Sequence, residues 1–167
     1  MDHIRIDTER FLVRTLLLSE DLESYLRWMQ NNVENKYILS ARSDYSLEQL
    51  KSFIHSDNIS SSRILLGIFD KNHGHIGNIR FSKIDRTKKS AEVGFLIGES
   101  KFRGIGVAEE VFLASVIWLK NDLHISTVYL GVDLNNIPAL NLYKKLGFVK
   151  VASQSTLDDI QKMKFEL

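Results

Sequence analysis

A strand, a buried helix and a second strand follow one another between residues 90 and 132, and this order constrains the fold most strongly. SAEVGFLIG (90–98) and STVYLGV (126–132) have the β-branched and aromatic content of strands. Between them, VAEEVFLASVIWLK (107–120) carries apolar residues on nearly every side, as a helix buried between layers does. Two strands joined in this way run parallel, with a right-handed crossover. The sequence therefore predicts a mixed α/β fold with a central parallel junction.

Antiparallel strands are expected before this junction. ILLGIF (64–69), HIGNIRFSKI (75–84) and the strand at 90–98 are separated by the polar turns DKNHG and DRTKK. This pattern predicts a three-stranded antiparallel meander. A further β-type segment runs from Phe11 to Leu17.

Two helices are expected between Leu17 and the meander, where they would flank the sheet. The first should begin after Ser19, because acidic residues follow that suit the positive end of a helix. Its apolar stripe comprises Leu22, Tyr25, Leu26 and Met29. The second should begin at Ser46, which forms a capping-box pattern with Gln49.

The last part of the chain predicts a helix and a hairpin. Asn135, Asn136 and Pro138 suit a helix start, and Gly147 suits its end. The apolar stripe of this helix comprises Ala139, Leu142, Tyr143 and Leu146. FVKVA (148–152) and KMKFEL (162–167) would then pair, and the inward residues would be Met163, Phe165 and Leu167.

Composition limits the class of protein. A chain of 167 residues is about the size of one ordinary domain, so we predict a single domain over 1–167. The 22 Lys and Arg residues balance 21 Asp and Glu residues to a net charge of +1, which argues against nucleic acid as a partner. The absence of cysteine excludes disulfides, thiolate chemistry and Cys-ligated zinc.

No membrane partner is expected either. The charged start MDHIRIDTERF lacks the apolar run of a signal peptide, and no apolar stretch approaches the roughly 18 residues of a membrane span. We therefore expect a soluble, cytoplasmic protein.

The loop that enters the buried helix is a candidate phosphate site. A glycine-containing turn at a helix start presents unpaired backbone N–H groups at the positive end of the helix dipole. The loop comprises Arg103, Gly104, Ile105, Gly106, Val107 and Ala108. It lacks the Walker A pattern and the third glycine of a dinucleotide fingerprint. A tight strand-to-helix turn with no ligand is the alternative.

Two segments resemble the core motifs of the GNAT superfamily of acyl-CoA-dependent N-acetyltransferases. The pattern [RQ]-x-x-G-x-[GA] is met by Arg103, Gly106 and Ala108. The pattern N-x-x-A-x-x-x-Y-x-x-x-G-F is met by Asn136, Ala139, Tyr143, Gly147 and Phe148. The amino-terminal TERFLVR followed by two helices resembles the branch that contains the ribosomal-protein N-terminal acetyltransferases and the spermidine or amino-sugar acetyltransferases.

The resemblance implies acetyl-CoA as co-substrate, and no metal is expected from the sequence. Backbone groups of Leu96, Ile97 and Gly98 would pair with the pantetheine arm, and the amides from Arg103 to Ala108 would hold the pyrophosphate. Asn136 would contact the pantetheine arm, a role compatible with its alternative as a helix N-cap. Lys145 would contact a coenzyme phosphate or belong to a solvated helix face. The histidines, such as His73 and His75, lack acidic partners at ligand spacing.

Two residues are candidate catalytic groups. The resemblance implies that the Tyr143 hydroxyl protonates the departing thiolate as a general acid, and the alternative is a core aromatic. Glu92 shares a strand face with Gly94 and is the candidate base for the amine, directly or through water. A solvated sheet face, with solvent as the proton acceptor, is the alternative for Glu92.

Acceptor contacts are expected from two regions. Asn78 and Arg80 share a strand face and could orient substrate, although polar strand residues are more often simply exposed. Tyr25, Trp28 and Tyr37, with Arg42, could line an acceptor pocket, although the helical spacing of Tyr25 suits a core position.

The expected activity is direct transfer of acetyl from acetyl-CoA to a primary amine in a ternary complex, without a covalent enzyme intermediate. The acceptor could be a protein N-terminal amine or a small amine such as an amino sugar or polyamine. A non-catalytic acyl-CoA-binding sensor or interaction module is the alternative. The oligomeric state stays open, and a homodimer is compatible with the sequence.

Overall fold

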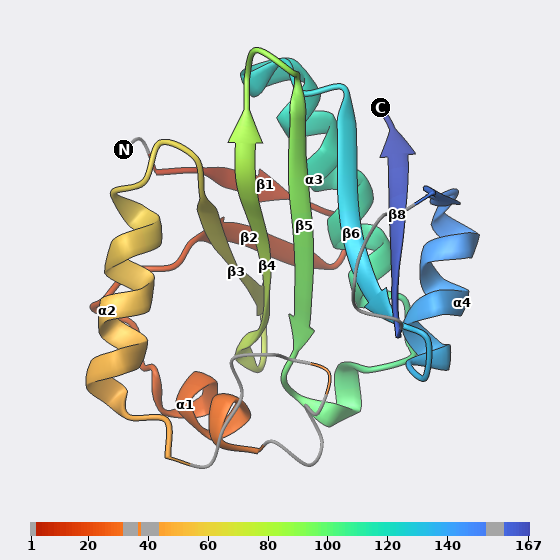
Figure 1. Cartoon of the computed structure of the whole chain (residues 1–167). Coiled ribbons are helices and arrows are strands. Elements are labelled where there is room, and N and C mark those ends of the chain that lie inside the picture. The colour runs from red at the N-terminus through yellow and green to blue at the C-terminus, as the bar shows by residue number, and fades with distance from the viewer. Residues whose placement is uncertain (1–2, 32–36, 38–43, 153–158) are drawn as a thin grey trace.

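The chain folds around one eight-stranded sheet with strand order β1-β2-β3-β4-β5-β6-β8-β7 (Figure 1). The computed structural model describes residues 3–31, 37, 44–152 and 159–167. The strands are β1 (Arg5–Asp7), β2 (Phe11–Thr15), β3 (Ile64–Asp70), β4 (Gly74–Asp85), β5 (Ser90–Ile97), β6 (Thr127–Asp133), β7 (Val149–Lys150) and β8 (Ile160–Glu166). The helices are α1 (Glu23–Gln30), α2 (Leu47–Asn58), α3 (Val107–Leu123) and α4 (Ile137–Leu146), with a 3-10 turn at Ser100–Phe102.

The only parallel pairing among the described strands joins β5 and β6, and it is short. Ser90 pairs with Thr127, and the ladder ends where Glu92 pairs with Tyr129. From residue 93 to residue 97, β5 pairs with β4 alone. The two parallel strands diverge toward the carboxyl end of β5, as Figure 1 shows. This divergence leaves one edge of β5 without a strand partner.

Each face of the sheet packs against its own helices. One core cluster joins strand residues such as Phe81 and Val128 to α3 residues such as Phe112 and Leu119, with α4 packed beside them. The other cluster joins α1 and α2 to the opposite face. It contains Leu16, Leu22, Tyr25, Trp28, Met29, Tyr45, Leu50, Ile54, Leu65 and Leu96. In Figure 1, α2 accordingly stands on one side of the sheet and α3 on the other.

The predicted α/β class, meander and parallel junction are confirmed, as are the helix signals at three positions. Ser46 accepts from the Gln49 amide in a complete capping box. Asn136 caps α4 by accepting from the Ala139 amide, and Gly147 ends that helix at a φ of 95°.

Several boundaries differ from the prediction. α1 begins at Glu23 rather than just after Ser19, because Asp21 binds the Glu23 amide in a turn ahead of the helix. α3 continues to Leu123, three residues beyond the predicted end. β1 was not predicted, since three residues are too short for a detectable pattern. The final hairpin forms, but β7 contributes only two residues to it.

No helix among the described residues is long and apolar enough to cross a membrane.

Candidate active site

A cavity of about 720 Å³ lies where β5 leaves β6, bounded by the start of α3 and one face of α4. Its lining comprises Tyr37, Phe95, Leu96, Ile97, Phe102, Arg103, Gly104, Gly106, Val107, Ala108, Glu109, Asn136, Pro138, Ala139, Leu142, Tyr143 and Lys145. Most of the predicted donor-site residues therefore converge on one cavity. Gly98 and Ile105 are not among the lining residues.

The predicted phosphate loop forms one wall of this cavity. Gly104 and Gly106 have φ angles of 75° and 83°, in the left-handed region that glycine adopts at little cost. Outside the helices and strands of the described chain, no backbone hydrogen bond is donated by the amides of Gly104, Ile105 or Gly106. α3 begins at Val107, so the free amides of its first turn and its positive dipole end extend the same wall.

The Arg103 side chain is hydrogen-bonded to the segment that precedes the loop. Its Nε donates to the Ile97 carbonyl at 2.8 Å, and its Nη2 donates to the Gly98 carbonyl at 3.1 Å. The Gly98 amide donates to the Ile76 carbonyl at 3.0 Å. Both backbone groups of Gly98 therefore have partners within the protein, whereas Leu96 and Ile97 border the cavity.

Asn136 and Lys145 approach the cavity from α4. Asn136 lines the cavity, and its Oδ1 accepts from the Ala139 amide at 3.3 Å, so the capping interpretation is confirmed. Lys145 Nζ pairs with Glu109 Oε2 at 2.5 Å across the cavity rim. This ion pair is exposed, so its contribution to stability is small.

Tyr143 lines the cavity from α4 and is held by aromatic neighbours. Its ring centroid lies 6.3 Å from that of Phe95 and 5.6 Å from that of Phe148. Burial raises the pKa of Tyr143 to about 12. Like that of an ordinary tyrosine, the hydroxyl keeps its proton at neutral pH, as a proton donor must.

Glu92 does not line the cavity. Its carboxylate binds Lys83 Nζ at 2.9 Å, and its side chain is 34% exposed. Glu92 lies in the paired part of β5, opposite Tyr129, and roughly 13 Å along an extended strand from Leu96. A base at Glu92 would have to act through water.

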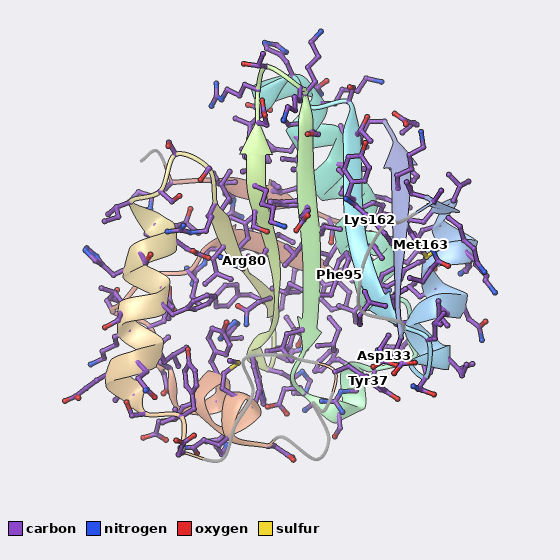
Figure 2. All side chains as sticks on the ribbon, in the orientation of Figure 1. Tyr37, Arg80, Phe95, Asp133, Lys162 and Met163 are labelled. Carbon is purple, nitrogen blue, oxygen red and sulfur yellow. The ribbon has the colours of Figure 1, made fainter. Side chains whose placement is uncertain are left out.

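Asn78 and Arg80 face α1 and α2 rather than the cavity. Asn78 is 3% exposed, and its Oδ1 lies 3.0 Å from His75 Nε2. Arg80 points from β4 toward α2, where it binds Asp57, a carboxylate only 1% exposed (Figure 2). Arg63 binds the same carboxylate at 2.8 Å. The buried Asp57 had no distinguishing signal in the sequence, because its partners Arg63 and Arg80 lie six and 23 residues further along the chain, on segments that only the fold brings to it.

Trp28 and Tyr37 were both predicted to line an acceptor pocket, and the structure separates them. Trp28 is 6% exposed inside the α1–α2 cluster. Tyr37 lines the cavity, and its hydroxyl donates to the Asn135 carbonyl at 2.9 Å. Figure 2 shows the labelled Tyr37 beside Asp133, where β6 ends. Arg42 lies outside the described residues.

Other lining residues, such as Phe95 and Leu142, were not predicted to belong to the site. Phe95 belongs to the apolar face of β5, and Ala139 and Leu142 belong to the stripe of α4. Helical spacing could have identified these α4 residues, since Ala139 lies four residues before Tyr143 and Leu142 lies three residues after Ala139. Among the described residues, no group of His, Asp and Glu side chains is arranged to hold a metal ion.

Comparison with known proteins shows which family the chain belongs to. The family model of the acetyltransferase (GNAT) domain matches residues 10–149. The N-acetyltransferase 9-like protein of Caenorhabditis briggsae is 25% identical over 150 residues, which make up 83% of this chain and 75% of that protein. The N-alpha-acetyltransferase of Sulfurisphaera tokodaii is 39% identical over 64 residues, 38% of each chain.

A solved structure supports the fold over nearly the whole chain. The crystal structure of spermidine N-acetyltransferase from Vibrio cholerae in complex with CoA and spermine has a TM-score of 0.74 and 20% identity. The alignment covers 94% of this chain and 95% of that chain. At this identity the match shows a shared fold, while the family model covers most of the sequence. The resemblance found in the two sequence motifs is thus confirmed, and the chain belongs to the GNAT family of acetyltransferases.

Proposed function

We propose that this protein transfers an acetyl group from acetyl-CoA to a primary amine by direct attack. The observation that carries the proposal is one continuous wall of backbone groups around the cavity. The free amides at the start of α3 and the unpaired edge of β5 border the same cavity, and Tyr143 also lines it. Such a wall suits a ligand that has a pyrophosphate at one end and an amide-bearing arm along a strand.

Each part of the donor would meet a different part of the wall. The amides from Gly104 to Ala108 would bind the pyrophosphate, with the Lys145 ammonium at the rim. Backbone groups of Leu96 and Ile97 would pair with the pantetheine arm, and Asn136 would contact the arm from the other side. This assignment leaves out Gly98, whose amide and carbonyl already have partners, and the Ile97 carbonyl, which accepts from Arg103 Nε.

The chemical step is a direct substitution at the thioester. The amine nitrogen attacks the thioester carbonyl carbon, the carbon–sulfur bond breaks, and the sulfur leaves as a thiolate. Tyr143 would protonate this thiolate, because the residue lines the cavity and its hydroxyl is protonated at neutral pH. The amine proton would pass to Glu92 through water or directly to solvent. Holding the amine against the thioester would supply much of the remaining rate acceleration.

The acceptor is an amine of one of two classes. Similarity to the N-alpha-acetyltransferase of Sulfurisphaera tokodaii supports a protein N-terminal amine. Similarity to the spermidine N-acetyltransferase of Vibrio cholerae supports a polyamine, and a small amine such as an amino sugar belongs to the same second class. A cytoplasmic location and a homodimer stay predictions from the sequence.

Release of free thiol from acetyl-CoA tests the proposal. The purified protein should be assayed with peptides, polyamines and nucleotide-linked amino sugars, with acetylated product identified by mass spectrometry. At least one acceptor class should release thiol in step with product. Tight acetyl-CoA binding without transfer to any amine would instead favour a non-catalytic acyl-CoA sensor.

A further inference from the structure

The turn between β1 and β2 is hydrogen-bonded to the first turn of α3, although about 100 residues separate them along the chain. Three donors converge on the Glu110 carboxylate. The Thr8 hydroxyl donates at 2.6 Å, the Arg10 amide at 2.7 Å and Arg10 Nε at 2.6 Å. Thr8 and Arg10 belong to the TERF segment (8–11), and neither residue lines the cavity.

Glu110 remains ionised in this arrangement. Its partial burial acts to raise its pKa, but the hydrogen bonds from Thr8 and Arg10 outweigh burial and leave the pKa below its usual value. Its side chain is 18% exposed, compared with 43% for Arg10. The carboxylate thus fixes one side of the Arg10 guanidinium through a charged hydrogen bond.

The other side of the guanidinium reaches the phosphate loop. Arg10 Nη1 donates to the Ile105 carbonyl at 3.1 Å. A Cβ atom placed on Gly106 would lie 3.4 Å from Arg10 Nη2. Arg10 therefore contacts the Ile105–Gly106 peptide, and Arg10 itself does not line the cavity.

The position of Arg10 determines where this peptide points its N–H group. The Ile105 carbonyl and the Gly106 N–H belong to the same trans peptide unit, so they point in opposite directions. Arg10 holds the carbonyl from outside the cavity, whereas Gly106 lines the cavity. The Gly106 N–H is accordingly directed away from Arg10.

We propose that Arg10 is a positioning residue for the donor site. It anchors the Ile105 carbonyl, and Glu110 anchors Arg10, so the Gly106 amide is oriented toward the donor pyrophosphate before the donor binds. This inference rests on the proposed function, since it assumes that the cavity takes acetyl-CoA. A preoriented amide spares the ligand the cost of ordering the loop.

A comparison of two acetyl donors tests the role of Arg10. Acetyl-CoA carries the pyrophosphate, and S-acetyl-pantetheine lacks it. In Arg10→Ala, the KM for acetyl-CoA should rise roughly 10- to 100-fold, the range for a lost hydrogen bond to a charged group. The kcat and the KM for S-acetyl-pantetheine should stay near the wild-type values. An equal rise in KM for both donors would overturn the proposal, and the contact between Arg10 and Ile105 would then be purely structural.

Two further variants separate geometry from charge. Arg10→Lys keeps the charge but loses the fork that reaches Glu110 and Ile105 together, so it should behave like Arg10→Ala. A wild-type KM for acetyl-CoA in Arg10→Lys would overturn the proposed geometry. Glu110→Gln should raise the KM for acetyl-CoA in the same direction, and it provides a second test if Arg10→Ala folds poorly.

A matched control and a binding measurement complete the design. Arg5→Ala removes an arginine from β1 that binds the exposed Asp7, and it should leave both donors unaffected. Calorimetry with CoA should give a weaker Kd for Arg10→Ala than for wild type, and equal values would overturn the proposal. If the wild-type protein itself fails to bind CoA, the proposed function fails instead.

Discussion

The Trp28 indole packs directly on the backbone of Gly98, so that a Cβ atom on this glycine would lie 1.9 Å from Trp28 Cδ2. Trp28 Nε1 also donates to Glu99 Oε1 at 3.2 Å. Helix α1 is thereby joined to the segment that leaves β5 and enters the phosphate loop. The contact explains why Trp28 is buried rather than available to an acceptor.

Gly98→Ala should therefore destabilise the fold. The added methyl group would overlap the indole, and the neighbouring atoms are ring atoms that cannot move independently. Overpacking of this kind costs about 1–3 kcal/mol in the free energy of unfolding. Urea denaturation followed by tryptophan fluorescence would measure the loss.

Gly94→Ala is the matched control, because Gly94 lies in β5, four residues before Gly98, and a Cβ there has no atom within 4 Å. Its free energy of unfolding should stay within about 0.5 kcal/mol of wild type. An equal loss in both variants would contradict the assignment to the Trp28 contact.

The second prediction concerns the phosphate loop. Gly106→Val adds a branched side chain at a φ of 83° and obstructs the approach of a phosphate to the backbone. Calorimetric affinity for acetyl-CoA should fall by at least about tenfold, the effect of losing one hydrogen bond to a charged group. Gly74→Val imposes similar backbone strain at a φ of 69°, away from the cavity, and should keep the affinity. Unchanged affinity in folded Gly106→Val would refute the donor-site assignment.

The third prediction separates the two interpretations of Tyr143. Tyr143→Phe keeps the ring and its contacts with Phe95 and Phe148 but removes the hydroxyl. Turnover should fall by about 10²–10⁴-fold, the usual contribution of a general acid, while acetyl-CoA affinity persists. Full turnover in this variant would leave Tyr143 as a core aromatic only.

The fourth prediction follows from the Tyr143 pKa of about 12, compared with 10.0 for an ordinary tyrosine. Between these pH values the unfolded chain has lost a proton that the folded chain retains, so the free energy of unfolding falls as pH rises. At pH 11 the loss due to Tyr143 is about 1.4 kcal/mol relative to neutral pH.

Urea denaturation at pH 9 and pH 11 measures this loss, which should be smaller in Tyr143→Phe than in wild type. Burial also raises the pKa of Tyr25, so part of the alkaline loss should persist in the variant. Identical pH dependence in the two proteins would argue against a buried Tyr143 hydroxyl.

Local signals in the sequence predicted most of the fold. The capping box at Ser46, the cap at Asn136 and the helix end at Gly147 depend on neighbouring residues, and all three occur as predicted. The position of β8 between β6 and β7 depends instead on long-range pairing. Nothing in the local sequence indicates that insertion.

The site was only partly predictable for the same reason. Gly106 and Tyr143 belong to contiguous motifs, and both line the cavity. Asn78 and Arg80 alternate as expected on β4, but the pattern could not show that α1 and α2 would cover their face. The bond from Arg10 to Ile105 likewise joins segments 95 residues apart, and only the folded chain brings them together.

The last prediction concerns Glu92 as the proton acceptor. Glu92→Gln keeps the shape of the side chain and removes its basicity, so acetyl-CoA affinity should persist while turnover decreases. The decrease should be largest at low pH, where the amine is mainly protonated. An unperturbed lysine-type amine has a pKa near ~10.4 and an α-amine near ~7.7–8.0, so a lysine-like acceptor gives the clearer test.

Lys83→Ala distinguishes proton transfer from a lost ion pair. It removes the partner of Glu92 but keeps the carboxylate, and an exposed pair of this kind contributes at most about 1 kcal/mol to stability. Both variants should therefore fold, and only Glu92→Gln should change the pH–rate profile with a common acceptor. Because Glu92 lies outside the cavity lining, a base there requires a water-mediated path to the amine. Superimposable profiles for wild type and Glu92→Gln would remove Glu92 from the mechanism and leave solvent as the proton acceptor.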